Sequence, residues 1–344
     1  MEQHRIVTPG PLLDDHGVLV QAGYATEPLL TYQRDRIKAP PWRIKEWDFY
    51  QVSNDVSCAQ FTIGHAAYAG QLAVTFFRFA DGLRFDRAAT LMLPFGSLHM
   101  PETSAEGVTA CRGGVSLGFR VETGASGETR RRLRCATTAT KTTPVIRADI
   151  TLTPGAGQSI VMATPFHEYP EAFYYNHKIS GMPASGEIRI GEDAFVFEPG
   201  SAFGLLDWGR GVWPFSTEWF WGSGSTMVDG VPFGWNIGSG FGDTSAASEN
   251  MLFYEGVAHK LSQVSFDEGS AHPLDPKHFG SDDGRFEMDF VPVYDRVTRT
   301  KLAFIDNECH QLFGRFTGTA VLDDGRVIRV RDVMAFAEHA VNHW

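Results

Sequence analysis

Three carboxylic acids lie in a stretch of the sequence that is rich in tryptophan. Asp207, Glu218 and Glu249 are interleaved with five of the eight tryptophans of the chain, namely Trp208, Trp213, Trp219, Trp221 and Trp235. Tryptophans combined with a few polar groups are typical of the wall of a small-molecule pocket. Burial raises the pKa of a carboxyl group, so that the group stays protonated near neutral pH and can donate a proton to an alkene, ether or carbonyl. The three acids are therefore candidate catalytic residues for acid-initiated hydration, dehydration, isomerisation or cyclisation.

Side chains around these acids are candidates for holding the substrate. They are Trp208, Trp219, Trp221, Trp235 and Asn236, together with Arg210. The guanidinium of Arg210 can bind a substrate carboxylate or neutralise one of the acids, and tryptophan faces can stabilise a developing carbocation. An aromatic core whose buried charges pair only with one another is the structural alternative. The sequence leaves both interpretations open.

Two histidines stand among polar neighbours in otherwise apolar strands. His177 lies between Asn176 and Lys178 in FYYNHKISGMP, and His310 precedes Gln311 in ECHQLFGRF. His177 and His310 are additional candidate acid/base groups, while Lys178 and Gln311 are candidate substrate-binding residues. The alternative for each histidine is a hydrogen-bonded core residue.

The sequence contains no motif that predicts a metal or an organic cofactor. His339 and His343 have the spacing of metal ligands, but the HExxH motif is missing, the four cysteines form no CxxC pair, and no GxxxxGK[ST] phosphate loop occurs. No spacing of serine, histidine and aspartate singles out a hydrolytic triad. We therefore expect a site that uses neither metal nor cofactor.

The overall charge argues against nucleic acid as a partner. The 344 residues carry a formal net charge of -11, which repels a phosphate backbone. The only basic run, Arg130 to Arg134, alternates with Leu133 and Cys135 and predicts one solvent-exposed face of a strand. The N-terminus has no apolar signal-peptide region, and no apolar run is long enough for a membrane span, which predicts a cytoplasmic protein. The tryptophan-rich stretch predicts a hydrophobic small molecule as its partner.

Alternating apolar residues and Asp-Gly dipeptides predict antiparallel strands throughout. We expect an all-β chain with few short helices, built from two barrels or sandwiches over residues 1–199 and 200–344, the second carrying the tryptophan-rich site. In RIKEWDFY, Trp47 and Phe49 face one way, while Glu46 and Asp48 either face the other way or serve as site groups. The apolar spacing at the C-terminus predicts one short helix over residues 333–344.

The expected strands place a condition on the site. If residues 205–210 and 217–221 are strands, Glu218 opposes Trp219 and Trp221. Asp207, Arg210 and Glu218 then line one cavity with Trp208, Trp219 and Trp221 only if the chain bends. Gly209, Gly211 and Pro214 are the residues that can supply the bend.

Several strings in the sequence carry a family resemblance. RIKEWDFY, NHKISGMPASG, LLDWGRGVWPF, GFGDTSAASEN, SDDGRFEMDF, HQLFGRFTG and FAEHAVNHW occur in consistent order over nearly the whole chain. They resemble the bacterial family known as domain of unknown function 2804, with Ala335 as a departure where a glycine is expected. That family is in turn remotely similar to the lipocalin-like two-domain proteins that include carotenoid hydratases, tocopherol cyclase and some Diels–Alder cyclases. The resemblance implies two lipocalin-like domains and action on a hydrophobic substrate in an aromatic cavity without an organic cofactor.

Two functional classes remain open at this point. An acid/base enzyme predicts at least one carboxylate inside the cavity without a compensating arginine or lysine. A non-catalytic carrier of a lipid-like or polyketide-like ligand predicts that every carboxylate is paired and that only the apolar volume matters. The arrangement of charges inside the cavity therefore distinguishes an enzyme from a carrier.

Overall fold

The chain folds almost entirely into β-strands. The computed structural model describes residues 3–66, 69–124, 127–154, 157–266, 272–302 and 305–343. Within these ranges the only helices are two short 3-10 turns, η1 (Arg34–Arg36) and η2 (Pro41–Arg43). The all-β prediction with few short helices is confirmed. No helix in the described part of the chain has the length and apolar character needed to cross a membrane.

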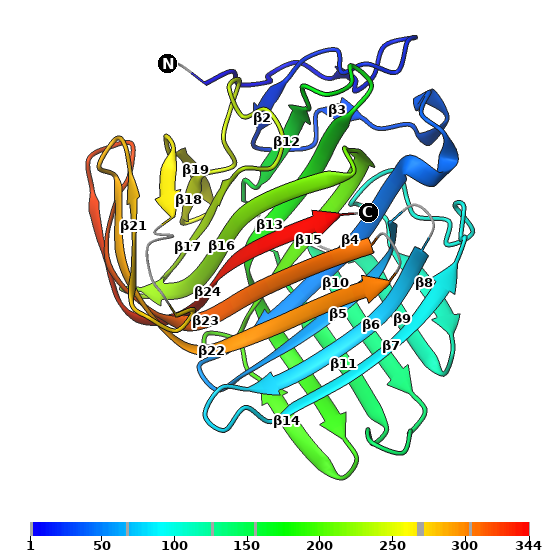
Figure 1. Cartoon of the computed structure of the whole chain (residues 1–344). Coiled ribbons are helices and arrows are strands. Elements are labelled where there is room, and N and C mark those ends of the chain that lie inside the picture. The colour runs from blue at the N-terminus through cyan, green and yellow to red at the C-terminus, as the bar shows by residue number, and fades with distance from the viewer. Residues whose placement is uncertain are drawn as a thin grey trace.

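The first large sheet curls into a nearly closed barrel (Figure 1). Its strands, in spatial order, are β7 (Arg84–Met92), β6 (Ala69–Arg78), β5 (Ser57–Ala66), β4 (Ile44–Ser53), β15 (Phe203–Val212), β13 (Phe173–Ile190), β11 (Ile146–Leu152), β10 (Thr129–Thr137), β9 (Val115–Thr123) and β8 (Val108–Arg112). The strands β6 and β7 at one end contact β8 and β9 at the other, which brings the two edges together. Short strands complete this half, namely β2 (Gly23–Ala25), β12 (Ile160–Pro165), β14 (Asp193–Phe197) and the parallel pair β1 (Gly10–Pro11) and β3 (Leu30–Thr31).

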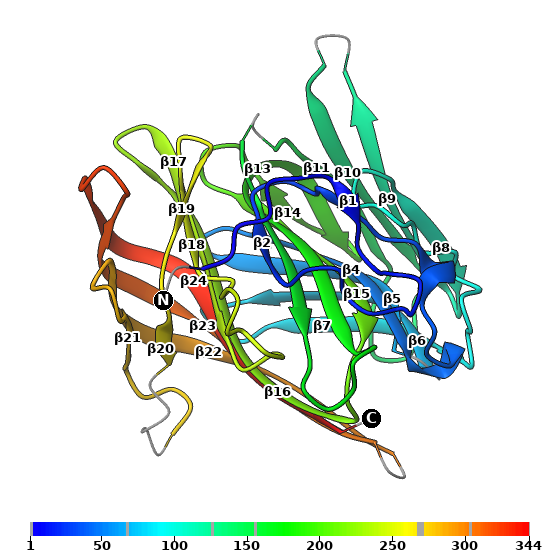
Figure 2. The ribbon, with the colours of Figure 1, turned by 90° about the horizontal axis from the view of Figure 1, so that it is seen from above.

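The second sheet is an open half-barrel that packs against the first (Figures 1 and 2). Its strands, in spatial order, are β19 (Val257–Lys260), β18 (Met251–Tyr254), β17 (Val231–Ser239), β16 (Ser216–Val228), β24 (Val327–His343), β23 (Ile305–Val321), β22 (Phe286–Leu302), β21 (Lys277–Ser281) and β20 (Val264–Phe266). The chain changes sheets between Val212 and Ser216. This point lies later than the boundary predicted between residues 199 and 200, because β15 inserts between β4 and β13 of the first sheet.

The predicted C-terminal helix is wrong. Residues 333–343 belong to β24, which pairs with β16 on one side and β23 on the other, and residue 344 lies outside the described residues. Phe336, Ala337 and Ala340 are all buried. A strand covered on both faces gives an apolar run that mimics helical spacing, and hydrogen bonds to two neighbouring strands decide the conformation.

Strand β13 organises the first half of the molecule. Its first part pairs with β12 and β15, and its second part pairs with β11 and β14, with a register shift between Ile179 and Met182. Gly181, Pro183 and Gly186 are residue types common in loops, but here they lie in a bulged continuation of one strand. A bulge bends and twists a strand locally, which lets β13 serve two parts of the barrel.

The Asp-Gly dipeptides form turns, as predicted. Asp229 and Gly230 both have positive φ, 52° and 81°, in the two-residue connection between β16 and β17. Positive φ at both positions is the requirement of a type I′ hairpin, which matches the twist of the flanking strands. The arginine run also behaves mostly as predicted, with Leu133 and Cys135 buried, but Arg131 turns inward and donates to the Tyr50 hydroxyl and the Ser104 carbonyl.

An apolar interface joins the two sheets. Besides the core of each half, a separate cluster packs between them, consisting of Cys58, Phe77, Phe79, Leu205, Trp221, Phe313 and Phe336. Gln311 is buried beside this cluster and accepts a 2.7 Å hydrogen bond from Gln60 of the first sheet. The sheets therefore meet through a packed surface, which fixes the walls of any cavity between them.

Candidate active site

A cavity of about 250 Å³ lies between the two sheets. Its walls come from both halves: Trp47, Phe49, Thr62, Tyr174, Lys178, Asp207 and Trp213 from the first, and Trp219, Trp221, Phe241, Glu249 and Glu338 from the second. Seven of these twelve residues are aromatic, and four carry ionisable carboxyl or amino groups. The tryptophan-rich stretch thus contributes to a cavity, with additional residues from strands far away in the sequence.

Strand alternation explains which side chains reach this cavity. On β4, Trp47 and Phe49 face it, while Glu46 and Asp48 point into the first barrel. On β16, Trp219 and Trp221 face it, while Glu218 points away. Both strands follow the period of two expected for pleated strands, and no bend interrupts it.

Asp207 lies in the cavity without an ion-pair partner among the described residues. It is buried, and its carboxylate accepts hydrogen bonds from Trp47 Nε1 at 3.0 Å and from the Tyr174 hydroxyl at 3.4 Å. Asn176 Nδ2 donates to the Tyr174 oxygen at 3.1 Å, which leaves the tyrosine proton to point toward Asp207. Burial raises the pKa of Asp207, although the charge of Lys178 and the Trp47 hydrogen bond act in the opposite direction.

Glu338 is a second cavity carboxyl that the sequence analysis missed. It is half-buried on β24 and accepts a 3.0 Å hydrogen bond from Trp219 Nε1. Burial raises its pKa against the opposing effect of that hydrogen bond and of Arg296. No arginine or lysine in the described ranges forms an ion pair with it. Its strand had been predicted as a helix, so its place opposite Trp221, within reach of the Trp219 indole, could not be foreseen.

Glu249 and Lys178 form the ionic pair of the cavity. The Lys178 ammonium contacts Glu249 Oε2 and lies over the Trp221 ring, 4.4 Å from its centroid. Asn236, buried behind the wall, accepts a 2.8 Å hydrogen bond from Trp221 Nε1 and donates to Glu249 Oε2 at 3.0 Å. Three of the predicted site residues therefore act together, and Asn236 supports them from outside the lining.

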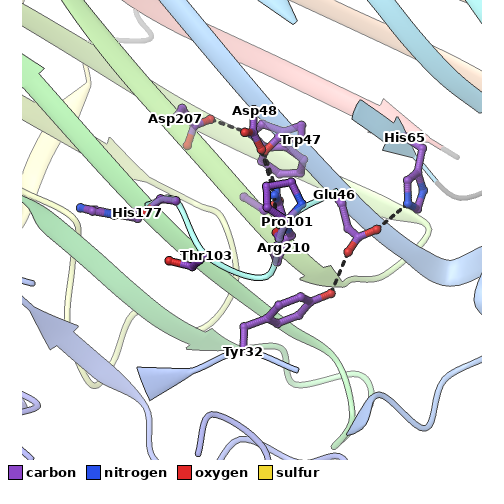
Figure 3. A network of polar contacts seen from close by, with 12 residues as sticks. Tyr32, Glu46, Trp47, Asp48, His65, Pro101, Thr103, His177, Asp207 and Arg210 are labelled. Atoms are coloured by element: carbon purple, nitrogen blue, oxygen red, sulfur yellow. Dashed lines mark hydrogen bonds and ion pairs between the residues drawn. The ribbon is translucent and has the colours of Figure 1, made fainter. Parts of the chain in front are cut away.

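Trp208 and Arg210 do not line this cavity. They alternate with Asp207 along β15 and are buried in the first barrel. Figure 3 shows Arg210 beside Pro101 and Asp48. Arg210 is fully buried, forms a 2.9 Å ion pair with Asp48, donates to the carbonyl oxygens of Trp47 and Pro101, and lies over the Trp208 ring. The expected shared cavity of Asp207 and Arg210 is wrong because β15 stays regular.

Glu218 and Trp235 also lie elsewhere. Glu218 is exposed and pairs with His339 at 2.7 Å on the outer face of β16. Trp235 is completely buried in the core of the second half, among aromatic rings that include Phe286 and Phe316. Glu218 does not reach the cavity because it lies on the face of β16 opposite to Trp219 and Trp221. Trp235 packs in the core of the second half.

The predicted histidines lie outside the cavity too. His177 is buried between the hydroxyls of Ser104 and Ser159, at 2.6 and 2.7 Å, and burial lowers its pKa to about 3. His310 is half-buried and bonded to Asp295 and Glu308; burial opposes protonation, but these carboxylates raise its pKa. Both residues fit the structural alternative of hydrogen-bonded histidines. Gln311 belongs to the interface described above.

The motifs examined for other chemistries find no support among the described residues. In that part of the chain no group of three or more histidine, cysteine, aspartate or glutamate side chains is arranged to hold a metal ion. The four cysteines are not disulfide-bonded. Gly114 to Gly118 has GxSxG spacing, but Ser116 lies in strand β9, which leads by a hairpin into β10 rather than into a helix.

Some of the missed cavity residues carried a readable signal. Trp47 and Phe49 had been assigned to one face of a strand, and Tyr174 lies two residues before Asn176 on β13, which is separated from that strand by β15. Thr62 and Phe241 gave none, because nothing in their local sequence distinguishes them from core residues. Their role follows only from the way the sheets pack.

Comparison with known proteins gives a family and a fold. The family model described as domain of unknown function (DUF2804) matches residues 3–344. No curated protein matches the chain. Among solved structures, the AttH-like protein of Nitrosomonas europaea has a TM-score of 0.57 at 15% identity, covering 97% of this chain and all of that one. Kievitone hydratase from Nectria haematococca has a TM-score of 0.55 at 8% identity, with 97% and 98% coverage. CghA with Sch210972 has a TM-score of 0.50 at 12% identity, with 98% and 97% coverage. These neighbours agree with a lipocalin-like fold.

Proposed function

This chain belongs to the DUF2804 family, and we propose that it is an acid/base enzyme that works without metal or organic cofactor. Its substrate is a hydrophobic small molecule bound in the tryptophan-lined cavity. The reaction is a hydration or dehydration, an isomerisation or a cyclisation, all of which begin with proton transfer to an apolar substrate.

The observation that carries this proposal is the charge arrangement of the cavity. Asp207 accepts hydrogen bonds from an indole and a phenol, Glu338 accepts one from an indole, and no described arginine or lysine forms an ion pair with either carboxyl group. Burial raises the pKa of both groups. A carrier does not need buried carboxyls of this kind, whereas a proton donor requires one.

The geometry supports a division of labour. Asp207 in its protonated form donates to the substrate, with Trp47 and Tyr174 holding its two oxygens so that the carboxyl group keeps one orientation. The indole faces of the cavity stabilise the positive charge that protonation creates. Glu249, ionised and paired with Lys178, accepts a proton in the second half of the reaction.

The fold neighbours are compatible with this chemistry. One of them is named as a hydratase, and it shares this fold over nearly its whole length. The alternative is a carrier for a lipid-like or polyketide-like ligand. The aromatic lining and the ion pair of Lys178 with Glu249 also suit that function.

An extract experiment tests the proposal. Wild-type protein is incubated with a total lipid extract, and mass spectrometry follows compounds that are consumed. We expect Asp207→Asn to abolish consumption and to retain ligand binding, because the amide keeps the shape but delivers no proton. The matched control is Glu218→Gln, which alters an exposed carboxyl outside the cavity and should leave the rate unchanged. Equal activity of Asp207→Asn and wild type would reject Asp207 as the proton donor.

A further inference from the structure

A much smaller pocket adjoins the main cavity. It is lined by Met162, Thr164, Tyr174, Asn176, Gly238, Ser239, Phe241, Thr244 and Glu249, and its volume is about 10 Å³. Tyr174, Phe241 and Glu249 line both spaces, so the small pocket opens beside the acid/base groups. A volume of this size corresponds to about one water molecule.

Asn176 presents an unsatisfied acceptor in this pocket. Its side chain is completely buried on β13, and its Nδ2 donates to the Tyr174 hydroxyl at 3.1 Å. Its Oδ1 has no hydrogen-bond donor among the residues that the structure describes. Buried polar atoms nearly always have a partner, which in such positions is commonly an ordered water.

Glu249 presents a second acceptor to the same pocket. Its Oε2 is engaged by the Lys178 ammonium and by Asn236 Nδ2. For Oε1, no hydrogen bond is made within the described part of the chain, and this oxygen lies next to Gly238, which also lines the pocket. An amide oxygen and a carboxylate oxygen facing one water-sized space can each accept one of the two protons of a water molecule.

We propose that this pocket holds the water molecule that the enzyme adds to, or removes from, a carbon–carbon double bond of its substrate. The inference rests on the proposed function and narrows it to hydration and dehydration. A water molecule that donates one hydrogen bond to Asn176 Oδ1 and one to Glu249 Oε1 has its lone pairs directed away from these acceptors. A nucleophile requires this orientation. Isomerisation and cyclisation need no such position.

Hydration of the alkene uses one proton from Asp207 and one water molecule. The Asp207 carboxyl gives its proton to one alkene carbon, and the other carbon becomes a cation beside the indole rings. The oxygen of the bound water forms a bond to that carbon while Glu249 takes one of its protons. The product is an alcohol, Asp207 is left ionised and Glu249 protonated, and exchange with solvent restores both groups. Dehydration is the reverse sequence.

A crystal structure of the wild-type protein, with ordered water resolved, provides the first test. We expect one water within hydrogen-bond distance of Asn176 Oδ1 and Glu249 Oε1. We expect it to be lost in Asn176→Leu and kept in Asn342→Leu, which alters a buried asparagine that lines neither pocket. A wild-type pocket without this water overturns the inference, and the wild-type result alone decides if Asn176→Leu does not fold.

The second test uses the compound consumed in the extract experiment, turned over in ¹⁸O-labelled water. We expect its product to gain one labelled oxygen, or, for dehydration, the reverse reaction to incorporate one. We also expect Asn176→Leu to lower kcat at least tenfold with little change in KM. Absence of label in both directions of the reaction overturns the water site but leaves the acid/base enzyme standing. Failure to consume any compound removes the proposed function, and the inference falls with it.

Discussion

At the residue scale, Asp207 shows how burial gives a carboxyl group a pH-dependent effect on stability. Its pKa in the folded protein is raised above the ordinary value, mainly by burial, so folding favours the protonated form. The contribution of Asp207 to the free energy of unfolding is fully present below the pKa that this group has in the unfolded chain. It is lost as the pH rises through the higher pKa that the group has in the folded protein. Each unit of raised pKa corresponds to about 1.4 kcal/mol.

We therefore predict that Asp207→Asn gains stability relative to wild type as the pH rises. Melting temperatures of both proteins, measured from about pH 4 to about pH 8, should converge at the acidic end and diverge toward neutrality in favour of the variant. Turnover should fall over the same range, because the active form carries the proton. A pH-independent difference in melting temperature would contradict the raised pKa.

Arg210 and Asp48 provide a structural contrast to Asp207. Both are buried inside the first barrel and pair at 2.9 Å. We predict that Arg210→Met or Asp48→Leu alone lowers the free energy of unfolding by about 3 to 5 kcal/mol, because each change leaves a buried charge unpaired. The double variant should lose far less than the sum. Urea denaturation measures all four proteins, and additive losses would argue against a coupled pair.

Residue types alone could not separate these two aspartates. Asp48 and Asp207 both stand next to tryptophan in strings that suggested a site. For Asp48, facing away from Trp47 was one of the two options that the sequence left open, and the structure has that one. Strict alternation predicted correctly that Glu218 opposes Trp219. The error was to assume a bend that would bring Arg210 and Glu218 round to Asp207, since glycines permit a bend without requiring one.

At the element scale, two glycines lie directly opposite tryptophans on neighbouring strands. Gly209 pairs with Trp47, and a Cβ added to it would lie 2.4 Å from the indole; Gly224 pairs with Trp235, with 2.2 Å to the indole. In each case the ring covers the glycine, a known device for strengthening sheets. Only the first pair borders the cavity.

We predict that Gly209→Ala and Gly224→Ala each destabilise the protein by about 1 to 3 kcal/mol, because the indole must move. Only Gly209→Ala should also reduce turnover strongly, since displacing Trp47 removes the hydrogen bond to Asp207. Thermal melts and rates with the compound identified from the lipid extract check both effects. Equal rates for the two variants would show that Trp47 does not position Asp207.

The strands themselves were largely predictable, and the exceptions have physical causes. Asp-Gly turns and alternating residues indicated strands in both halves. The last strand was mistaken for a helix because β24 is buried on both faces, which removes the polar–apolar alternation that identifies a half-exposed strand. That mistake also concealed Glu338.

At the scale of the whole molecule, strand order decides where the chain can be divided. β15 lies between β4 and β13, so the first barrel needs residues beyond 200. We predict that a fragment of residues 1–214 gives a strand-rich circular dichroism spectrum and a cooperative melt, while residues 1–199 do not. Similar behaviour of the two fragments would mean that β15 contributes little to the first barrel.

The cavity as a whole was beyond prediction from the sequence. Its walls depend on how the barrel packs against the half-barrel, and no local pattern encodes that contact between residues separated widely in the chain. Tryptophan enrichment indicated the region, and alternation indicated faces. The partners Thr62, Phe241 and Glu338 became visible only once the interface placed them together.

The ionic pair of the cavity has one partner in each half of the chain, Lys178 before the change of sheets and Glu249 after it. The same division holds for Asp207 and Glu338. One wall of the cavity is therefore encoded before the codons for residues 213–215 and the other wall after them. A crossover between related genes near these codons would exchange one wall and keep the other. New combinations of substrate shape and proton donor could thus arise in a single recombination event, without any point mutation in the cavity.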